Sequence, residues 1–301
     1  MKGRFEIAYR DRATDRIERE RVFAGSFLYW LYNTGPGRVA GAVIRRRWAS
    51  RLYGWLQRQP ASRPRIAEFI EAMGIDMSEC RKRPEEFASF AEFFVREIDP
   101  GKRPIDPDPA ACVAPCDGRV LAYPTIEAGQ PFRIKRHLFD LERCLGDPKL
   151  ARRFAGGVLV VSRLALRDYH HFHFPVAGVP GEARAIGGRY DAGGPYSLKR
   201  LLPFFSENFR MVTTLTDTRF GAVAMVEVGA LTVGSIVQRF TPGARVEKGA
   251  HKGWFGLGGS TIALLFERGA IVLDPDLLES TGREIETFVR MGERIGTARH
   301  G

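Results

Sequence analysis

The sequence predicts an α+β protein, in which a helical N-terminal lobe precedes a body built mainly of antiparallel or mixed β-sheet. The segments with helical spacing of apolar residues lie within residues 1–106. From residue 111 onwards, short apolar and β-branched runs follow one another, and glycines separate many of them. Regular strand–helix alternation and Gly-rich nucleotide-binding loops do not occur, which argues against a doubly wound parallel sheet. We therefore expect a helical lobe over residues 1–106 and a β-rich body over residues 107–301.

The most apolar long stretch of the lobe, residues 23–44, approaches the length of a membrane span. Gly35-Pro36-Gly37 and Arg38 interrupt it, and a proline breaks a helix while an arginine is costly in hydrocarbon. We therefore expect two short apolar helices with a break between them, and no transmembrane helix. The basic run Arg45-Arg46-Arg47 follows, with tryptophan and tyrosine close behind, as in segments that lie at a lipid–water interface. The alternative is that these apolar faces pack on the protein's own core.

Two further helices are expected after a Pro-rich linker at residues 59–64, over residues 66–73 and 84–98. The second contains an aromatic stripe at helical spacing, which favours core packing. The stripe consists of Phe87, Phe90, Phe93 and Phe94. The strands expected in the body are the runs at residues 158–161, 222–228, 231–237 and 261–266.

The formal net charge of +11 favours anionic partners such as nucleic acid, an acidic lipid surface or an acidic substrate. An evenly solvated basic surface would give the same number. No recognisable nucleic-acid-reading module occurs, so we expect no nucleic-acid partner. The four cysteines form no CxxC pair and no zinc spacing, which is typical of reduced thiols. Residues 1–22 have no apolar signal-peptide core and contain acidic residues, so neither a secretory signal nor a mitochondrial transit peptide is expected.

Two of the three motifs that could support chemistry are glycine turns. Asp117 precedes Gly118 directly after a short apolar run, which is a turn signal. Further on, Gly256-Leu257-Gly258-Gly259 leads directly to Ser260 and an apolar strand. A glycine turn into a strand is common. However, Gly259 has no side chain to shield its carbonyl, and glycine can adopt the strained dihedrals that aim this carbonyl at the next hydroxyl, so Ser260 could attack the preceding peptide bond.

The third motif is Asp168-Tyr169-His170-His171-Phe172-His173, which contains three of the six histidines. An extended backbone would place His171 and His173 on one face, whereas a helical turn would pair His170 with His173. Metal binding is one alternative function, although a third ligand at defined spacing is missing. Ordinary half-buried histidines are another.

Together these motifs resemble those of the phosphatidylserine decarboxylase proenzymes, in a fixed order and over nearly the whole length. The similar phrases are Phe93-Phe94-Val95-Arg96 with Arg103-Pro104-Ile105, Pro115-Cys116-Asp117-Gly118, Asp168 to His173, Val228-Gly229-Ala230 with Val233-Gly234-Ser235-Ile236, and Lys248-Gly249 with Gly253-Trp254-Phe255 and Gly259-Ser260-Thr261. The chain departs from the family pattern at His171, where arginine is usual, at Ala250-His251-Lys252, where the stretch is usually more acidic, and at Gly258, where leucine is frequent.

The resemblance implies an enzyme that cuts its own chain between Gly259 and Ser260. It assigns a catalytic triad of Asp117, His173 and Ser260. In this triad His173 accepts the Ser260 proton, while Asp117 orients the imidazole and stabilises its charged form.

Cleavage would leave a β chain of residues 1–259 and an α chain of residues 260–301, which together form a heterodimer; a homodimer of these is a further option. The resemblance implies that the α chain begins with a covalent pyruvoyl cofactor made from Ser260. This group would serve as the electron sink when phosphatidylserine loses carbon dioxide and becomes phosphatidylethanolamine. His170 or His173 would protonate the product.

The implied location is the cytoplasmic face of a bacterial membrane, with the enzyme bound peripherally to anionic phospholipid. No metal is expected. One alternative is a pyruvoyl-dependent decarboxylase of a soluble amino acid, against which the apolar and basic lobe argues. Another is a non-enzymatic lipid-binding β-module, against which the joint presence of Asp117, His173 and Ser260 argues.

Overall fold

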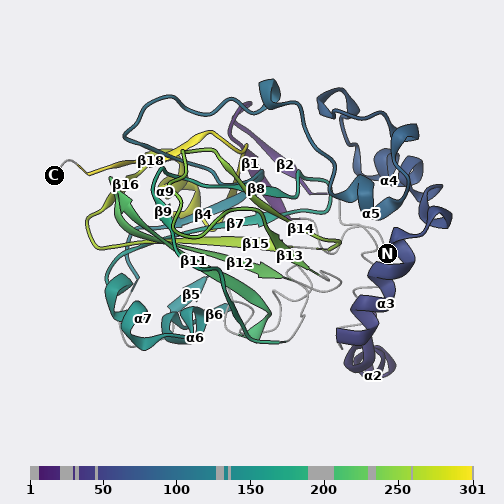
Figure 1. Ribbon diagram of the computed structural model, residues 1–301, viewed down its shortest axis with the longest axis horizontal. Coiled ribbons are helices and arrows are strands. Elements are labelled where there is room, and N and C mark those ends of the chain that lie inside the picture. Colours follow the sequence, from purple (N-terminus) through teal and green to yellow (C-terminus); the bar gives the residue numbers. More distant parts are fainter. Residues whose placement is uncertain are drawn as a thin grey trace.

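The computed structural model describes residues 7–20, 30, 34–44, 47–126, 132–134, 137–188, 207–229, 235–258 and 260–299. A ten-stranded sheet forms the centre of the molecule (Figure 1). Its strands run in the order β10-β11-β12-β15-β7-β4-β17-β1-β2, and β9 pairs with β11 beside them. Neighbours are antiparallel except β1 and β17, which are parallel. The strands are β1 (Ala8–Asp11), β2 (Arg16–Arg19), β4 (Gly118–Tyr123), β7 (Val158–Leu164), β9 (Val179–Pro180), β10 (Arg184–Ile186), β11 (Arg210–Thr218), β12 (Gly221–Gly229), β15 (Ser260–Phe266) and β17 (Glu286–Val289).

Three smaller sheets accompany the large one. β13 (Ile236–Gln238), β14 (His251–Phe255) and β8 (His171–His173) form the first, in that order. β16 (Ile271–Leu273), β18 (Arg294–Ala298) and β3 (Ala111–Val113) form the second. β5 (Phe132–Ile134) and β6 (His137–Phe139) form a hairpin. A mixed sheet accompanied by a few helices confirms the predicted α+β class.

The middle strands of the large sheet explain the apolar runs of the sequence. Every residue of β7 and of β15 is buried. A strand that is covered on both faces has no solvent-facing side chains, so the apolar runs at residues 158–161 of β7 and 262–266 of β15 do not alternate with polar residues. The strands expected at residues 158–161, 222–228 and 261–266 are confirmed. Of the run expected at residues 231–237, residues 231–234 lie outside the described residues, and β13 begins at Ile236.

Helices α2 to α5 gather at one end of the molecule, blue and on the right in Figure 1. They are α2 (Gly35–Ile44), α3 (Arg47–Arg58), α4 (Arg65–Met73) and α5 (Phe90–Phe94), with the 3-10 turns η1 (Pro60–Ser62), η2 (Met77–Glu79), η3 (Pro84–Glu86) and η4 (Pro100–Lys102) between and after them. The other helices in the described ranges are α6 (Leu141–Leu145), α7 (Pro148–Phe154) and α9 (Pro275–Gly282). The helix expected at residues 66–73 is confirmed as α4.

The single helix expected over residues 84–98 is wrong. The chain forms the 3-10 turn η3, becomes extended, and starts a new helix at Phe90, where the Ser89 hydroxyl accepts the Glu92 N–H (3.2 Å) and caps the first turn. The aromatic stripe nevertheless packs as core: the Phe69 ring lies edge-on to Phe90 at 5.2 Å and to Phe93 at 6.3 Å.

Residues 1–106 also contribute strands to the large sheet, because β1 and β2 form a hairpin at its edge. Sequence reasoning did not anticipate this hairpin, since β2 is exposed along its whole length and lacks an apolar face. The division of the chain at residue 106 remains a prediction.

None of the helices in the described ranges is long and apolar enough to cross a bilayer. α2 begins at Gly35 with Pro36 in its first turn, where a helix tolerates proline. The first of the two expected apolar helices falls on residues 23–29 and 31–33, which lie outside the described residues, as do Arg45 and Arg46 of the basic run.

Candidate active site

Three central strands bring two of the sequence motifs to one edge of the large sheet. Ser260, the first residue of β15, pairs with Leu164 at the end of β7. Gly118, at the start of β4, lies level with Leu164 on its other side, because the neighbouring Arg119 and Arg163 are paired. Adjacent strands lie ~4.8 Å apart, so the backbones at Ser260 and Gly118 are separated by roughly 10 Å. The chain that leaves β7 crosses this same edge and leads into the histidine motif.

Ser260 is buried, with 2% of its surface exposed. Its Oγ has no hydrogen-bond partner within the described part of the chain. A buried hydroxyl without a partner costs about 1–3 kcal/mol, and such groups are typical of functional sites. Gly258, two positions earlier, has a φ of 125°, a conformation that favours glycine. Gly259, and with it the expected scissile bond, lies outside the described residues.

The histidine motif is extended where it forms β8, as one of the two alternatives predicted. His171 and His173 lie on one face of the strand, and their ring centroids are 5.0 and 5.2 Å from the ring of His251 on β14. His171 Nε2 lies 2.9 Å from the Val95 carbonyl, which can only accept, so this nitrogen bears the proton. His171 Nδ1 is then the acceptor for His251 Nε2, 2.9 Å away. Two of the residues that depart from the family pattern are thus in direct contact.

His173 is held as a neutral imidazole. Its Nδ1 lies 2.9 Å from the Gly249 carbonyl and must therefore donate. Burial lowers the pKa of His173 to about 4. The lone pair is consequently on Nε2, which is 3.4 Å from the Tyr169 hydroxyl. Such a nitrogen can accept a proton at neutral pH.

His170, directly before β8, is fully buried, and its ring centroid lies 4.1 Å from that of Phe94. Its Nδ1 donates to the Asp168 carbonyl (2.9 Å), and its Nε2 has no hydrogen-bond partner among the described residues. Burial lowers the pKa of His170 to about 3, against smaller opposing contributions from the Asp168 and Gly258 backbones. The effect of Gly258 indicates that the ring lies beside the segment that leads to Ser260.

Asp117 is buried in the loop between β3 and β4 and is paired with Arg103. Arg103 Nε donates to Asp117 Oδ1 (2.8 Å) and its Nη2 donates to Oδ2 (2.6 Å). The Met291 N–H also donates to Oδ1 (2.8 Å), and Arg103 Nη2 additionally contacts Glu79 (2.9 Å). These contacts use both carboxylate oxygens and fix the Asp117 side chain.

The three residues of the expected triad therefore share one region of the molecule without direct hydrogen bonds between them in the described structure. Asp117 faces Arg103, His173 faces Gly249, and the Ser260 hydroxyl is free of partners there. Hydrogen bonds of catalytic groups often form only in the reacting complex, so the triad stays a prediction.

Asp168 is a site residue that sequence reasoning overlooked. Its buried carboxylate pairs with Arg119 and accepts the Ala165 N–H (2.6 Å), which closes the turn after β7, while its carbonyl accepts from His170. Arg119 is itself held between the rings of Tyr9 and Phe288, 4.8 and 5.0 Å from its guanidinium carbon. The signal that could have found Asp168 was its place at the start of the histidine motif.

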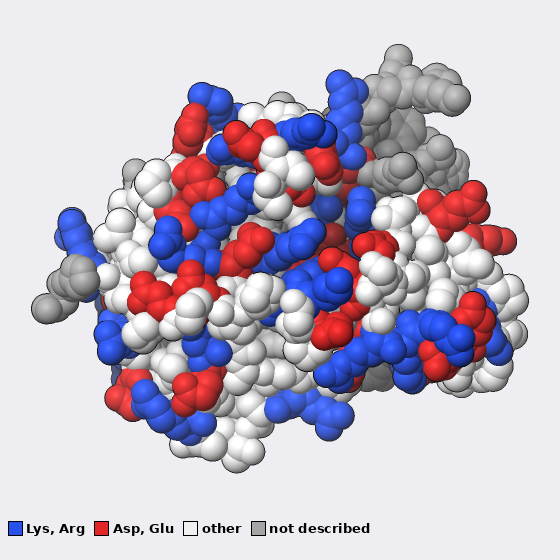
Figure 2. All heavy atoms as spheres, turned by 90° about the horizontal axis from the view of Figure 1, so that it is seen from above, with Lys and Arg blue, Asp and Glu red and all other residues white. Residues whose placement is uncertain are grey.

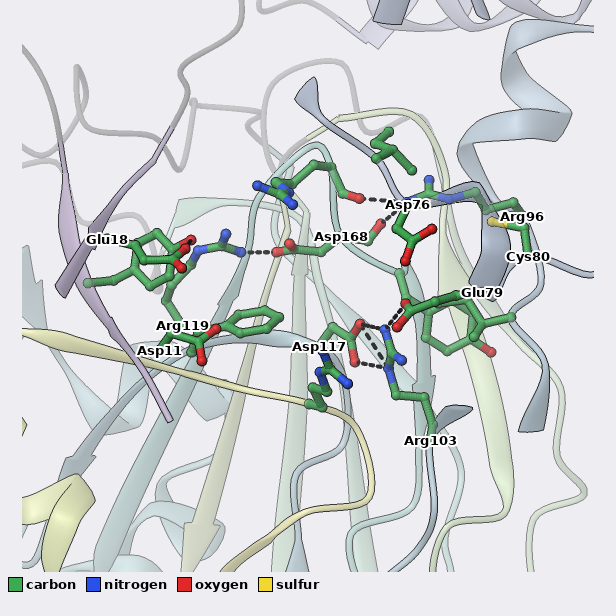
Figure 3. Close-up of a pocket in the computed structure, with 17 residues that line it drawn as sticks. Asp11, Glu18, Asp76, Glu79, Cys80, Arg96, Arg103, Asp117, Arg119 and Asp168 are labelled. Carbon is green, nitrogen blue, oxygen red and sulfur yellow. Dashed lines mark hydrogen bonds and ion pairs between the residues drawn. The ribbon is translucent and has the colours of Figure 1, made fainter. Parts of the chain in front are cut away.

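A pocket of about 250 Å³ opens beside Asp117 and Asp168 (Figure 3). Arginines and carboxylates line it together, and Arg103 lies between Asp117 and Glu79 in the view. Among the residues that the structure describes, those of the pocket included, no group of three or more histidine, cysteine, aspartate or glutamate side chains is arranged to hold a metal ion. This edge of the sheet carries a buried hydroxyl, neutral imidazoles and paired carboxylates. Such groups serve in acid–base and nucleophilic catalysis.

The fold and the site thus define an α+β protein with a buried hydroxyl at a sheet edge. Comparison with known proteins identifies its family. The family model for phosphatidylserine decarboxylase matches residues 90–297, which include every motif residue described above. The chain therefore belongs to the phosphatidylserine decarboxylase family.

Individual relatives agree over nearly the full length. A phosphatidylserine decarboxylase proenzyme of Chlamydia trachomatis serovar L2 is 42% identical over 292 residues, which cover 97% of each chain. A proenzyme of the same name from Fusobacterium nucleatum subsp. nucleatum is 40% identical over 296 residues, 98% of this chain and 99% of the relative. One from Chlamydia caviae is 41% identical over 292 residues, 97% of this chain and 98% of the relative.

Proposed function

We propose that this chain is a self-processing decarboxylase that converts phosphatidylserine to phosphatidylethanolamine and carbon dioxide at a membrane surface. The observation that carries the proposal is the Ser260 hydroxyl, which is buried and has no partner in the described structure at the first position of a central strand. The relatives named as proenzymes support a chain that must be cut before it acts.

The proposed cut lies between Gly259 and Ser260. A neutral imidazole takes the Ser260 hydroxyl proton, and Oγ attacks the Gly259 carbonyl carbon, so that the peptide C–N bond breaks and an ester forms. A base then removes the Ser260 Cα proton, and the ester oxygen leaves with residues 1–259 as their new carboxylate. Water hydrolyses the remaining dehydroalanine, which releases ammonia and leaves a pyruvoyl group at the start of residues 260–301.

The residues around Ser260 fit a group of this kind. It would form from a side chain that is already buried, next to the segment that the His170 ring approaches, and burial keeps both His170 and His173 neutral. Once formed, the pyruvoyl group supplies a carbonyl that withdraws electrons as the substrate carboxylate leaves. We assign proton removal from Ser260 to His173, supported electrostatically by Asp117. We assign delivery of a proton to the product to His170, whose Nε2 first takes the proton that the substrate ammonium group gives up. The position of the His170 ring beside the Gly258 backbone supports the second assignment.

The surface of α3 supports a lipid substrate. Leu52, Tyr53, Trp55 and Leu56 are 39–53% exposed, while Gln57 of the same helix is buried. A helix that presents its large apolar residues to the outside is typical of a surface that docks on a membrane or a partner. Figure 2 shows Lys and Arg interspersed with Asp and Glu over the face drawn, so the positive charge is not collected into one patch on that face. We therefore propose peripheral attachment through the apolar surface of α3, on the cytoplasmic face of a bacterial membrane.

Mass spectrometry of the intact purified protein tests the cut. We expect two chains, residues 1–259 and residues 260–301, with a pyruvoyl group in place of Ser260, whereas Ser260→Ala should stay whole and inactive. A wild-type protein that remains one chain of 301 residues under all conditions would contradict the proposal. Supplying vesicles of phosphatidylserine and, separately, free serine then distinguishes the lipid enzyme from a decarboxylase of a soluble amino acid. A cut protein that releases carbon dioxide from neither substrate would favour a non-enzymatic lipid-binding module.

A further inference from the structure

Arg96 is an almost fully buried cation without a carboxylate partner among the described residues. Its side chain is 4% exposed, and its Nε and Nη1 have no hydrogen-bond partner there. Nη2 donates to the Arg167 carbonyl (2.5 Å) and the Asp168 carbonyl (3.3 Å), and the Cys80 thiol is a further neighbour of the guanidinium group. The Phe93 ring lies 5.2 Å from the guanidinium carbon, which offers partial compensation. A buried charge without a counter-ion costs several kcal/mol, so the remaining donors are suited to an anion that is not part of the chain.

Arg96 is one of the residues that line the pocket of Figure 3, where its side chain reaches from the right of the view to the neighbourhood of Asp76 and Asp168. Two further arginines, Arg167 and Arg290, line the same pocket, and neither has an ion pair with a described residue. Three guanidinium groups around one cavity are typical of a site for phosphate, since the planar fork of arginine matches its oxygens.

The carboxylates in this pocket are largely committed to other partners. Asp117 and Glu79 share Arg103, and Asp168 pairs with Arg119. Asp11 and Glu18 lie at the opposite end of the pocket from Arg96 (Figure 3). The carboxylate nearest to Arg96 in that view belongs to Asp76, which is exposed and accepts the Ser78 N–H (2.9 Å). Because solvent screens an exposed charge, Asp76 weakens an anion site at Arg96 without abolishing it.

Arg96, which lines the pocket, and His170, the candidate catalytic histidine, donate to the same oxygen atom. The Asp168 carbonyl oxygen accepts both from Arg96 Nη2 and from His170 Nδ1. A molecule held at Arg96 is therefore next to the residue that lies beside the Gly258 backbone. This is the arrangement required for a substrate whose phosphate is bound at one point while its amine and carboxylate react close by.

We propose that this pocket binds the phosphate of the phospholipid head group, with Arg96 as its principal donor. The inference rests on the proposed function for the identity of the head group. Arg96 is then a specificity residue, because it raises the affinity for substrates that have a phosphodiester next to the reacting serine.

Calorimetric titration of whole Ser260→Ala protein with sn-glycero-3-phosphoserine, inorganic phosphate and free serine tests the proposal. The phosphodiester should bind more tightly than either of the other two. Arg96→Gln should weaken its binding by about tenfold or more, whereas Arg268→Gln, which removes an exposed arginine, should have no effect. Asp76→Asn keeps a residue that can cap the turn and should tighten binding by about two- to fivefold. A fold-disrupting change could not produce that gain, so this variant remains decisive even if Arg96→Gln fails to fold.

The outcomes separate this proposal from the proposed function. Equal binding of the phosphodiester by parent, Arg96→Gln and Asp76→Asn overturns the phosphate site. Binding of inorganic phosphate at least as tight as that of the phosphodiester overturns the head-group assignment in favour of a free-phosphate site. In the self-processed enzyme, Arg96→Gln should raise KM for phosphatidylserine with little change in kcat. A chain that binds the phosphodiester through Arg96 and never cuts itself would contradict the proposed function alone.

Discussion

The buried ion pair of Lys252 offers a test of how the two halves of the site are held together. Lys252 Nζ donates to Glu227 Oε1 (2.8 Å) and to Gln238 Oε1 (2.6 Å), and Gln238 Nε2 donates to Glu227 Oε2 (3.0 Å). Glu227 belongs to β12, where it pairs with Ile262 of β15, two residues beyond Ser260. Lys252 belongs to β14, which pairs with the histidine strand β8. The ion pair thus joins the sheet of the serine to the sheet of the histidines.

Lys252→Met keeps most of the apolar stem and removes the charge, so that Glu227 is left buried with only Gln238 as a partner. Both charged side chains have no exposed surface, and breaking such a pair from one side costs about 3–5 kcal/mol. Replacing both partners, as in Lys252→Met with Glu227→Gln, should cost less than Lys252→Met alone, because no uncompensated charge remains.

The cost of Lys252→Met should also depend on pH. Burial raises the pKa of Glu227, and without Lys252 the opposing attraction disappears. A folded-state pKa above the unfolded value gives stability that is full below the unfolded pKa and is lost as the pH rises through the folded pKa. The variant should therefore lose more stability, relative to its parent, at higher pH.

Urea unfolding in the Ser260→Ala background, where the chain is expected to stay whole, measures these differences. Lys149→Met, which removes an exposed lysine, is the matched control and should change the free energy of unfolding by no more than about 0.5 kcal/mol. The reasoning is refuted if Lys252→Met costs as little as this control, or if the double replacement costs the sum of the two single ones. In otherwise wild-type protein, Lys252→Met should slow self-cleavage, because the two sheets are then less firmly held together.

Three further outcomes are expected. Asp168→Asn, which removes the charge facing Arg119, should slow self-cleavage by about ten- to a hundredfold in a time course of intact mass, because the histidine turn loses its position; an unchanged rate would contradict this role. Burial lowers the pKa of the histidines at residues 170–173 to about 3 to 4, so the unfolded chain gains protons first as the pH falls. The free energy of unfolding should then fall below a pH of about 6.5, by up to about 1.4 kcal/mol per pH unit for each histidine, and a flat pH profile would exclude this. Asp168, whose pKa burial raises to about 6, partly offsets the loss, since it holds its proton in the folded state. Trp55→Ser should weaken binding to anionic vesicles by about tenfold or more, whereas Val272→Ser, at a position that is also half exposed, should not.

The strands and helices that could be predicted from the sequence are those whose formation depends on residues close together in the chain. The apolar runs at residues 158–161 and 262–266 do not alternate, because the strands β7 and β15 to which they belong are buried along their whole length. The prediction of one helix over residues 84–98 was wrong. Aromatic residues at this spacing can pack into a core whether or not the backbone between them is helical. The cap at Ser89 and the extended residues before it interrupt the helix at a point that apolar periodicity does not mark.

The polar part of the site could not be predicted in the same way. Arg103, Arg119 and Lys252 would each be expected at the surface, since a charged side chain is rarely buried unless it is paired. These partners come from distant parts of the sequence, and only the folded sheet brings them together. Motif matching finds Asp117, the histidines and Arg103, but only the structure shows that Arg103 holds Asp117.

The place of Ser260 in the sheet also explains how a chain could be cut there without losing its active site. β15 is a central strand, paired over all its seven residues with β7 on one side and over the same seven with β12 on the other. A break before its first residue would leave these two ladders intact, so the new chain end would stay at the sheet edge. On the other side of the break, Gly258 lies in a loop outside the strands, where released residues can move away. The strand therefore fixes the reacting group, and the glycines before it provide the freedom that cleavage requires.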